Sequence, residues 1–471
     1  MVAGRDRDDG AAGDGIIRDG TVGDSEARRI ADTMTSAPEA SPEVADVPWP
    51  RPQSEALTDE FDYDLPPELV AQAPVEPRDA SRLLVIDCAT AGLTHRAFRD
   101  LPDLLDPGDV LVVNDSRVIA ARLHARRPTG GRAELLLLRP VLHLPSPPGR
   151  GAGGEGEDEG GWSPWWEALV RPANRLRAGQ VLVIESPLDA ASLSREAGEG
   201  SASLSRRSGG GTEGGGSGGA CADDDGPSLA VSIRESPTAP ARAEVGPRLA
   251  SGGIAVRFDR PVDEVTVRHG DVPLPPYVRQ RLVDGSRYQT VYARETGSAA
   301  APTAGLHFTP ALLESVRARG VEVVPVTLHV GADTFLPVRV DRIADHPMHA
   351  EYAVVPDATA AVIARARREG RRVTCVGTTA VRATESWARA HGAARADLPA
   401  TGWHGWTRLF LVPGAPFLVA DALVTNFHVP RSTLLMLVSA FAGMATVRAA
   451  YAAAIGGRYR FYSFGDACLF R

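Results

Sequence analysis

Lysine is absent from the sequence of 471 residues, and all 51 basic residues are arginine. This absence excludes a Walker A loop, in which a lysine side chain reaches the phosphates of a bound nucleotide. No Gly-x-Gly pattern follows a predicted strand, so a Rossmann dinucleotide site is not indicated either. The formal charge of −8 argues against a protein that coats nucleic acid through overall basicity. A local basic face stays open, because arginine binds phosphate in a bidentate manner.

Cysteine is scarce, and long apolar segments are missing. The four cysteines, at positions 88, 221, 375 and 468, form no Cys-x-x-Cys pair, so neither a zinc knuckle nor a disulfide framework is indicated. The N-terminal segment lacks the apolar region of a signal peptide. The longest apolar stretch, 434–445, is shorter than the roughly 20 residues that cross a bilayer. We therefore expect a cytoplasmic protein that does not bind membranes.

Composition changes along the chain and predicts two domains. Residues 1–57 are rich in Asp, Gly, Ala and Pro and predict a disordered tail. Short β-rich pieces between 123 and 268, such as AELLLLRPV and IAVRFD, predict an inserted β-barrel-like domain. Low-complexity loops at 145–161 and 193–253 interrupt that domain. The remaining residues, 58–122 and 269–471, are expected to form one discontinuous catalytic domain.

Strands and helices alternate after Pro273, which favours a mixed α/β fold. Helices are predicted near 310–319 and 358–369, and strands at 321–330 and in RVTCVGTT at 372–379, which opens into another helix. A last strand and helix follow in ADALVTNFH and STLLMLVSAFAG. We expect polar residues at the strand ends to form the ligand site.

Histidines and carboxylates gather between His329 and Glu351, with Asp345 among them. The His-x-x-His-x-Glu pattern from His346 through His349 to Glu351 has a spacing that could ligate a metal. Because Pro347 biases His346 toward an extended conformation and no cysteine cluster supports the site, a metal is not favoured. A catalytic or hydrogen-bonding role is favoured instead, and a structural role is the alternative.

The segment APTAGLHF places a turn of small residues next to a histidine. Thr303 and Gly305 would let the backbone approach a ligand closely, and His307 offers a near-neutral pKa. The alternative is a turn that caps a helix.

The segment VGTTAVRATES combines a strand end with a helix start. Thr378 and Thr379 at that start suit a carboxylate or a phosphate. Arg382 and Glu385 lie three residues apart on one helical face. Taken alone, an N-cap with a surface ion pair explains the same pattern.

Polar side chains accompany two further predicted strands. DALVTNFHVPRST sets Asp421, Thr425, Asn426 and His428 around a strand end before an apolar helix, which indicates a lined pocket. The predicted polar loop 114–117 adds Asp115 and Arg117 as candidates.

Together these segments closely resemble the S-adenosylmethionine:tRNA ribosyltransferase-isomerase family of queuosine biosynthesis. The resemblance covers nearly all of 61–470 except the two low-complexity stretches. It runs, in the family's order, through FDYDLPPELVAQAP, PGDVLVVNDSRVIAARL, PLPPYV, YQTVY, APTAGLHF, TLHVGADTF, DHPMHAEY, VGTTAVRATES, DALVTNFHVPRSTLLMLVSAF and YRFYSFGDACLF.

The resemblance implies transfer and isomerisation of the ribosyl part of S-adenosylmethionine onto the 7-aminomethyl group of a 7-deazaguanine base in tRNA. The product would be epoxyqueuosine-tRNA, and adenine and methionine would leave. The resemblance also implies a two-domain monomer with a β-barrel-like insertion, and no metal or cofactor besides S-adenosylmethionine as the donor substrate.

This chemistry needs a base at the 5′ carbon beside the sulfonium and an acid that protonates the leaving adenine. We assign His307 or His349 as the base, Asp421 as the acid and Asp345 as the group that orients a histidine. Arg382 would hold a carboxylate or phosphate. The other expected substrate-binding residues are Asp115, Arg117, Thr303, Gly305, His329, Glu351, Thr378, Thr379, Glu385, Thr425, Asn426 and His428.

Contacts to tRNA phosphates are expected from RARREGRR at 365–372, or from Arg458 and Arg460, with a solvated helix face as the alternative. The sequence departs from the family pattern at Asp333, Ala380 and Arg408. A family paralogue that acts on another acceptor, or a non-catalytic RNA-binding module, is therefore the alternative function.

Overall fold

The computed structural model describes residues 54–141, 162–185, 240–249, 253–280, 282, 284–331 and 338–471. These residues fall in one compact unit that spans 46–471. Nearly all of the predicted tail, the whole loop 145–161, and residues 193–239 and 250–252 of the second loop lie outside the described residues.

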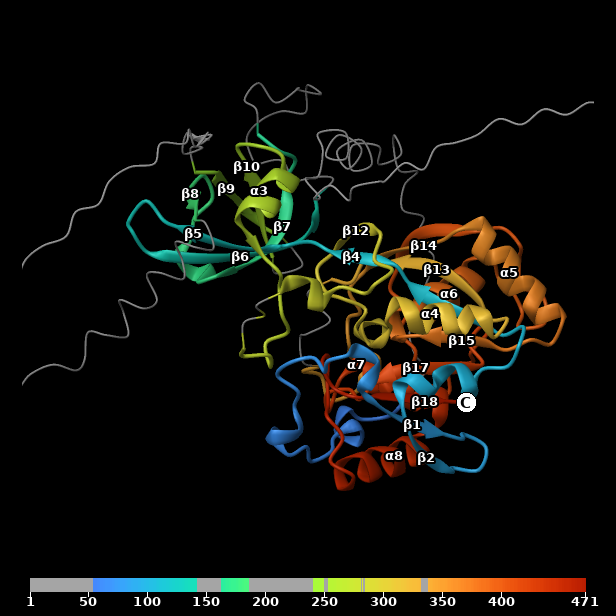
Figure 1. Cartoon of the computed structure of the whole chain (residues 1–471). Helices are drawn as coiled ribbons and strands as arrows, with labels where there is room; N and C mark the ends of the chain where they lie inside the picture. Colours follow the sequence, from blue (N-terminus) through green and yellow to red (C-terminus); the bar gives the residue numbers. More distant parts are fainter. Residues whose placement is uncertain are drawn as a thin grey trace, which may run out of the picture. The chain divides into compact units, whose positions relative to one another are not determined.

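A mixed nine-stranded sheet is the larger sheet in the described part of the chain (Figure 1). Its strands are β1 (Arg82–Ile86), β2 (Leu93–Ala97), β3 (Val110–Asn114), β13 (Glu322–Leu328), β14 (Glu351–Val355), β15 (Val373–Val376), β16 (Trp403–Thr407), β17 (Ala422–Asn426) and β18 (Ala467–Phe470). They follow the order β16-β14-β13-β3-β15-β17-β18-β1-β2. Strands β13, β3, β15 and β17 are parallel, so their carboxyl ends meet at one edge of the sheet.

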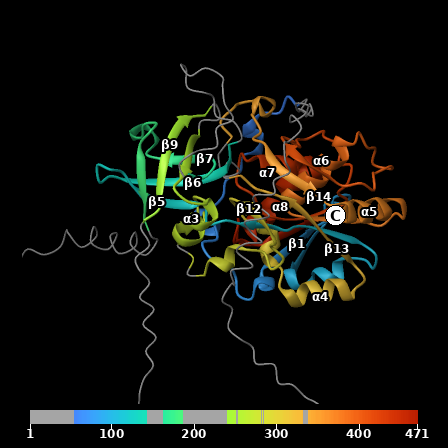
Figure 2. The ribbon, with the colours of Figure 1, turned by 90° about the horizontal axis from the view of Figure 1, so that it is seen from above.

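Helices cover both faces of this sheet (Figure 2). They are α4 (Pro310–Ala318), α5 (Asp357–Arg368), α6 (Thr378–Ala390), α7 (Thr433–Ala442) and α8 (Met444–Gly456), with short 3₁₀ helices η4 (Phe98–Leu104) and η7 (Thr303–His307). Val110 and Val112 of β3 pack in the core cluster that contains residues of α5 to α8. Leu111 and Val113 pack in the cluster that contains residues of α4, η4 and η7. Burial of alternate side chains on both faces explains why these strands read as continuous apolar runs.

A second, antiparallel sheet forms the barrel. Its strands are β5 (Arg122–Arg126), β6 (Arg132–Pro140), β7 (Trp166–Arg171), β8 (Val181–Ile184), β9 (Arg242–Arg248), β10 (Ile254–Phe258) and β11 (Gly270–Asp271), and the helix α3 (Val262–His269) lies between β10 and β11 in the chain. The order is β11-β5-β6-β7-β10-β9-β8, and pairing of β5 with β8 closes six strands into a barrel. Alternate residues such as Leu123, Leu135 and Val256 fill its interior.

Shorter elements complete the described structure. A two-stranded parallel sheet joins β4 (Ser116–Val118) to β12 (Glu295–Ser298). The other 3₁₀ turns are η1 (Thr58–Phe61), η2 (Pro67–Leu69), η3 (Arg78–Ala80), η5 (Ala173–Arg175), η6 (Gly285–Tyr288) and η9 (Ile343–Asp345). Among the described helices, none is long and apolar enough on its own to cross a membrane. Helices α7 and α8 reach the required length and apolar composition only when they are taken together, and the pair is bent by 114°.

The predicted fold class, mixed α/β with a barrel, is confirmed. Two local predictions are wrong. Residues 114–117 are not a loop, because Ser116–Val118 pairs with β12. Residues 242–248, placed in a low-complexity loop, form β9 because Ala243 and Val245 enter the barrel core. The exact limits of the two domains stay a prediction.

Candidate active site

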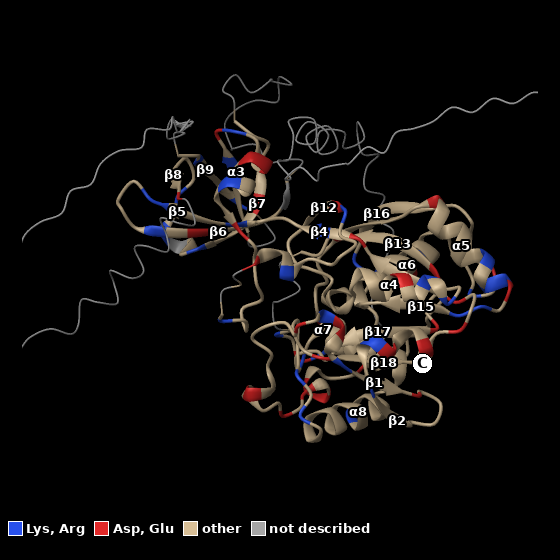
Figure 3. Cartoon of the chain, in the orientation of Figure 1, with Lys and Arg blue, Asp and Glu red and all other residues tan. Residues whose placement is uncertain are grey.

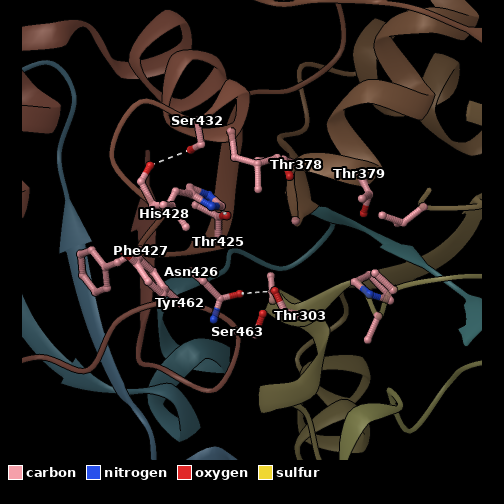
Figure 4. Close-up of a pocket in the computed structure, with 18 of the residues that line it drawn as sticks. Thr303, Thr378, Thr379, Thr425, Asn426, Phe427, His428, Ser432, Tyr462 and Ser463 are labelled. Carbon is pink, nitrogen blue, oxygen red and sulfur yellow. Dashed lines mark hydrogen bonds between the residues drawn. The ribbon is translucent and has the colours of Figure 1, made fainter. Parts of the chain in front are cut away.

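A cavity of about 440 Å³ lies at the sheet edge where the parallel strands end (Figure 4). Val330 follows β13, Gly377 follows β15 and Phe427 follows β17, so three of the four parallel strands contribute to its wall. Its volume is in the range of small-molecule sites. The residues that line it are Pro276, Tyr277, Ala300, Ala301, Pro302, Thr303, Ala304, Val330, Gly377, Thr378, Thr379, Thr425, Asn426, Phe427, His428, Val429, Pro430, Arg431, Ser432, Leu434, Tyr462 and Ser463.

Two tyrosines form an aromatic wall of the cavity. The ring centroids of Tyr277 and Tyr462 are 4.7 Å apart, and the Tyr277 hydroxyl lies 2.6 Å from the Ser463 hydroxyl. Burial raises the pKa of both phenols to about 12, so both are neutral near pH 7. The backbone of Tyr462 has a φ of 72°, which costs energy for a residue with a side chain. Its N–H donates to the Phe427 carbonyl at 3.0 Å, which helps to hold the ring in this position.

The N-terminus of α6 forms another part of the wall. Gly377 precedes the helix with a φ of 86°, a conformation that suits glycine, and gives no side-chain cap to the first N–H groups. Thr378 and Thr379 line the cavity (Figure 4). Uncapped N–H groups at a helix start favour a negatively charged ligand group.

His428 lies on the wall that follows β17. Its Nε2 is 2.9 Å from the Thr425 hydroxyl. Its backbone N–H donates to the Tyr451 hydroxyl at 2.9 Å, and its carbonyl accepts from the Tyr63 hydroxyl. Burial lowers the pKa of His428 to about 3, so the imidazole is neutral near pH 7. Thr425 and His428 therefore meet in the cavity.

His307 lies behind the wall rather than on it. Its Nδ1 is 2.8 Å from the Ser81 hydroxyl, and its Nε2 is 3.2 Å from the Asn426 side-chain nitrogen. Burial lowers its pKa to about 4, and the Phe98 ring packs against it with centroids 4.8 Å apart. Both ring nitrogens are occupied inside the protein. The structure therefore does not bring His307 to the cavity as a base.

A smaller cavity of about 60 Å³ shares Leu434 with the first and contains His349, Glu351 and Arg382. Arg382 pairs with Glu351, and its Nε donates to the Leu409 carbonyl at 3.1 Å. Burial lowers the pKa of Arg382 to about 10. The carboxylate that Arg382 holds in this structure is that of Glu351.

Two expected site residues lie elsewhere and connect parts of the fold through ion pairs and hydrogen bonds. Asp421 precedes β17, at the end opposite to Asn426, where it pairs with Arg367 at 2.9 Å and accepts from the Val373 N–H at 2.8 Å. Its predicted position beside Asn426 is wrong, because the whole strand separates the two residues. Glu385 is fully buried, accepts from the N–H groups of 418–420 and pairs with Arg389.

The remaining candidates also lie outside the cavity lining. Asp115 accepts from the Thr327 hydroxyl at 2.7 Å and pairs with Arg294, while Arg117 and Asp345 are exposed. Gly305 is required by packing, since a Cβ there would lie 2.0 Å from the Tyr292 hydroxyl. The His329 ring packs beside Gly297, and burial lowers its pKa.

No group of three or more His, Cys, Asp or Glu side chains within the described ranges is placed to hold a metal ion. Of the His-x-x-His-x-Glu pattern, Glu351 is already paired with Arg382 and accepts from the Gly331 N–H at 3.0 Å.

Comparison with known proteins gives a consistent result. Residues 58–470 match the model of a family described as queuosine biosynthesis protein. The S-adenosylmethionine:tRNA ribosyltransferase-isomerases of Moorella thermoacetica and Rubrobacter xylanophilus are each 44% identical, over 87% and 88% of this chain and 98% and 97% of theirs. The enzyme of that name from an Anaeromyxobacter species is 46% identical over 87% of this chain and 97% of its own. Among solved structures, the S-adenosylmethionine tRNA ribosyltransferase of Thermotoga maritima is 33% identical, covering 88% of this chain and 100% of that chain, with a TM-score of 0.42.

The chain belongs to the queuosine biosynthesis protein family. The resemblance drawn from the sequence motifs is thereby confirmed. Six of those motifs contribute to the one cavity, namely PLPPYV, APTAGLHF, TLHVGADTF, VGTTAVRATES, DALVTNFHVPRST and YRFYSFGDACLF.

Sequence reasoning missed several residues of this cavity. Tyr277, Arg431, Ser432, Tyr462 and Ser463 come from irregular segments without a period that would predict a site. The motifs PLPPYV and YRFYSF were the available signal, since a tyrosine lies in each beside a turn.

Two of the three departures from the family pattern lie in the described residues. Ala380 is a fully buried residue in the first turn of α6, and Arg408 is exposed after β16. Neither is among the residues that line the cavity. Asp333 lies outside the described residues.

Proposed function

We propose that this protein transfers and isomerises the ribosyl part of S-adenosylmethionine onto the 7-aminomethyl group of 7-deazaguanine in tRNA. Adenine and methionine leave, and epoxyqueuosine-tRNA is the product. The observation that carries the proposal is the convergence of six family motifs on one cavity of about 440 Å³. Family membership and relatives that carry this enzyme name support it.

The walls of the cavity suit the parts of a sulfonium nucleoside. Tyr277 and Tyr462 offer aromatic surface on which adenine can stack. The uncapped start of α6 at Thr378 and Thr379 suits the methionyl carboxylate. Thr303 and Asn426 offer hydrogen bonds close to the aromatic wall (Figure 4).

The positions of His307, His349 and Asp421 in the structure determine which of them could transfer protons to or from the ligand. The sulfonium acidifies the neighbouring 5′ C–H, and a positioned base accelerates its loss by roughly 10²–10⁴-fold. Of the two histidines considered as the base, His349 is the one that lines the small cavity next to the site. We therefore propose His349 as the base and withdraw Asp421 as the acid.

The test is an incubation of the protein with S-adenosylmethionine and tRNA that carries 7-aminomethyl-7-deazaguanine, followed by chromatography of released adenine. Release that depends on this tRNA supports the proposal. Release only with another acceptor would instead identify a paralogue, and binding of tRNA without any release would identify an RNA-binding module. A His349→Ala variant should lose at least 100-fold in rate while its binding of S-adenosylmethionine changes little, and wild-type turnover would contradict its role.

A further inference from the structure

Four polar side chains connect the buried interior to the cavity in a single row. The Thr303 hydroxyl donates to the Asn426 side-chain oxygen at 3.0 Å (Figure 4). The Asn426 side-chain nitrogen lies 3.2 Å from Nε2 of His307, and Nδ1 of His307 lies 2.8 Å from the Ser81 hydroxyl. Thr303 and Asn426 line the cavity, whereas Ser81 and His307 do not.

Each hydrogen bond of this row is donated toward the interior of the protein. The Asn426 amide nitrogen can only donate, so Nε2 of His307 must be the unprotonated nitrogen. A neutral imidazole then carries its proton on Nδ1 and donates it to Ser81. With its nitrogen committed to His307, Asn426 presents its oxygen to Thr303, and that oxygen accepts the hydroxyl proton of Thr303.

The consequence concerns the ligand. A threonine hydroxyl has one proton and two lone pairs. Because the proton of Thr303 is directed at Asn426, only lone pairs remain for the cavity. We infer that Thr303 is an obligatory acceptor for an O–H or N–H donor of the ligand, and that His307 is a positioning residue that fixes this polarity through Asn426. This inference rests on the proposed function.

S-adenosylmethionine has four groups that could be the donor. They are the 2′ and 3′ hydroxyls of the ribose, the 6-amino group of adenine and the methionyl ammonium. A site built to accept a hydrogen bond discriminates strongly against an analogue that lacks the donor, because the protein acceptor then loses its partner. Thr303 is thus a determinant of specificity for one of these groups.

The experiment is a cycle of ligand and protein changes, read out by isothermal titration calorimetry. The ligands are S-adenosylmethionine, its 2′-deoxy and 3′-deoxy forms, the analogue with purine in place of adenine, and the analogue without the α-amino group. The proteins are the wild type, Thr303→Val and the matched control Thr303→Ser. We expect one analogue to bind the wild type and Thr303→Ser at least about 10-fold more weakly than S-adenosylmethionine. Thr303→Val should bind that analogue and S-adenosylmethionine equally.

The role of His307 is tested by the same ratio of dissociation constants. His307→Gln keeps an acceptor near the position of Nε2 and should preserve the ratio. His307→Leu leaves the Asn426 nitrogen without an acceptor, so Asn426 can turn and the ratio should fall toward one. Turnover of His307→Leu should fall through a higher KM for S-adenosylmethionine rather than a lower kcat. If the ratio of dissociation constants fell equally in His307→Gln and His307→Leu, the imidazole would matter only for packing. If His307→Leu does not fold, Asn426→Leu replaces it, with the same expected loss of the ratio.

The outcomes separate this inference from the proposed function. Wild type that releases adenine and binds S-adenosylmethionine, but shows no analogue ratio that depends on Thr303, would overturn the inference and leave the proposed function standing. Wild type that neither binds S-adenosylmethionine nor releases adenine would overturn both.

Discussion

Tyr462 is a single residue whose backbone and side chain both indicate a ligand contact. Its φ of 72° is unfavourable for tyrosine, yet it places the ring against the cavity. We expect Tyr462→Leu to weaken binding of S-adenosylmethionine by roughly 5- to 100-fold, the range of base stacking on an aromatic side chain. Tyr462→Phe is the matched control and should change the dissociation constant little. If the two variants bind equally well in calorimetry, the ring does not stack on the ligand.

Two buried histidines make stability depend on pH. The pKa of His307 is lowered to about 4 and that of His428 to about 3, against about 6.5 in an unfolded chain. Below pH 6.5 the unfolded state therefore binds protons that the folded state does not. The free energy of unfolding should fall as pH drops from 6.5 toward 4, by about 1.4 kcal/mol per pH unit for each histidine.

Urea unfolding between pH 7.5 and 4.5 measures this dependence. His307→Gln serves as the control, because it removes one titrating group and keeps a polar side chain. Its slope below pH 6.5 should be smaller by about 1.4 kcal/mol per pH unit. Equal slopes in the two proteins would mean that His307 titrates normally in the folded state.

Residues at strand ends could be predicted as site residues, and residues in irregular segments could not. Thr378, Thr425, Asn426 and His428 lie at or just after the ends of strands whose apolar runs are plain in the sequence, and all four line the cavity. Tyr462 lies in a loop whose path depends on a tertiary hydrogen bond to Phe427, which no local pattern encodes. The partners of His307 are more than 100 residues away in sequence, so its burial was not predictable.

At the scale of elements, predictability follows burial. Strands β3, β15 and β17 are buried along their whole length and appear in the sequence as apolar runs. Edge strand β2 has three exposed residues in the sequence LTHRA and gave no signal. Strand β16, WHGWT, is also half polar and ends the opposite side of the sheet. The central strands determine the position of the cavity. The location of the site could therefore be predicted from the sequence, whereas the edge strands of the sheet could not.

Asp421 has a structural role because the length of one strand separates it from the cavity. The five residues of β17 place Asp421 about 16 Å from Asn426 along the strand. Asp421 binds Arg367, Arg395 and the Val373 N–H and so joins α5 to the sheet. We expect Asp421→Asn to lower the free energy of unfolding by about 1–3 kcal/mol, the usual cost of weakening hydrogen bonds to a charged group.

The same variant should release adenine at a rate within about twofold of the wild type, because Asp421 does not touch the cavity. Exposed Asp397→Asn is the control for the loss of one negative charge and should change neither quantity. A rate loss of 100-fold or more in Asp421→Asn, with stability unchanged, would restore it as a catalytic acid.

At the scale of the whole molecule, charge is arranged in local pairs rather than in a basic face at 365–372. Figure 3 shows segments of the ribbon coloured blue for arginine and red for Asp and Glu near one another around α5. Arg365 and Arg371 each lie 2.7 Å from Glu322, and Arg367 lies 2.9 Å from Asp421. These arginines hold the helix to the sheet. The expected contact of this segment with tRNA phosphates therefore has less support than the sequence alone indicated.

The chain enters and leaves the barrel at adjacent positions. We therefore predict that the catalytic domain binds S-adenosylmethionine without the barrel. Arg122 of β5 and Asp271 of β11 are direct antiparallel partners, so their Cα atoms are about 5 Å apart. Among the residues described, those that line the main cavity all lie after 275. Replacing 122–271 by a short Gly-Ser linker should therefore leave the dissociation constant for S-adenosylmethionine within about threefold, because none of the lining residues named above is removed and the joined ends are already neighbours. The remaining domain should stay folded, since each twofold change in loop length alters the closure entropy by only about 0.6 kcal/mol. Calorimetry and thermal unfolding check this result, with the full chain as the reference. A variant that unfolds cooperatively but no longer binds S-adenosylmethionine would show that the barrel completes the site.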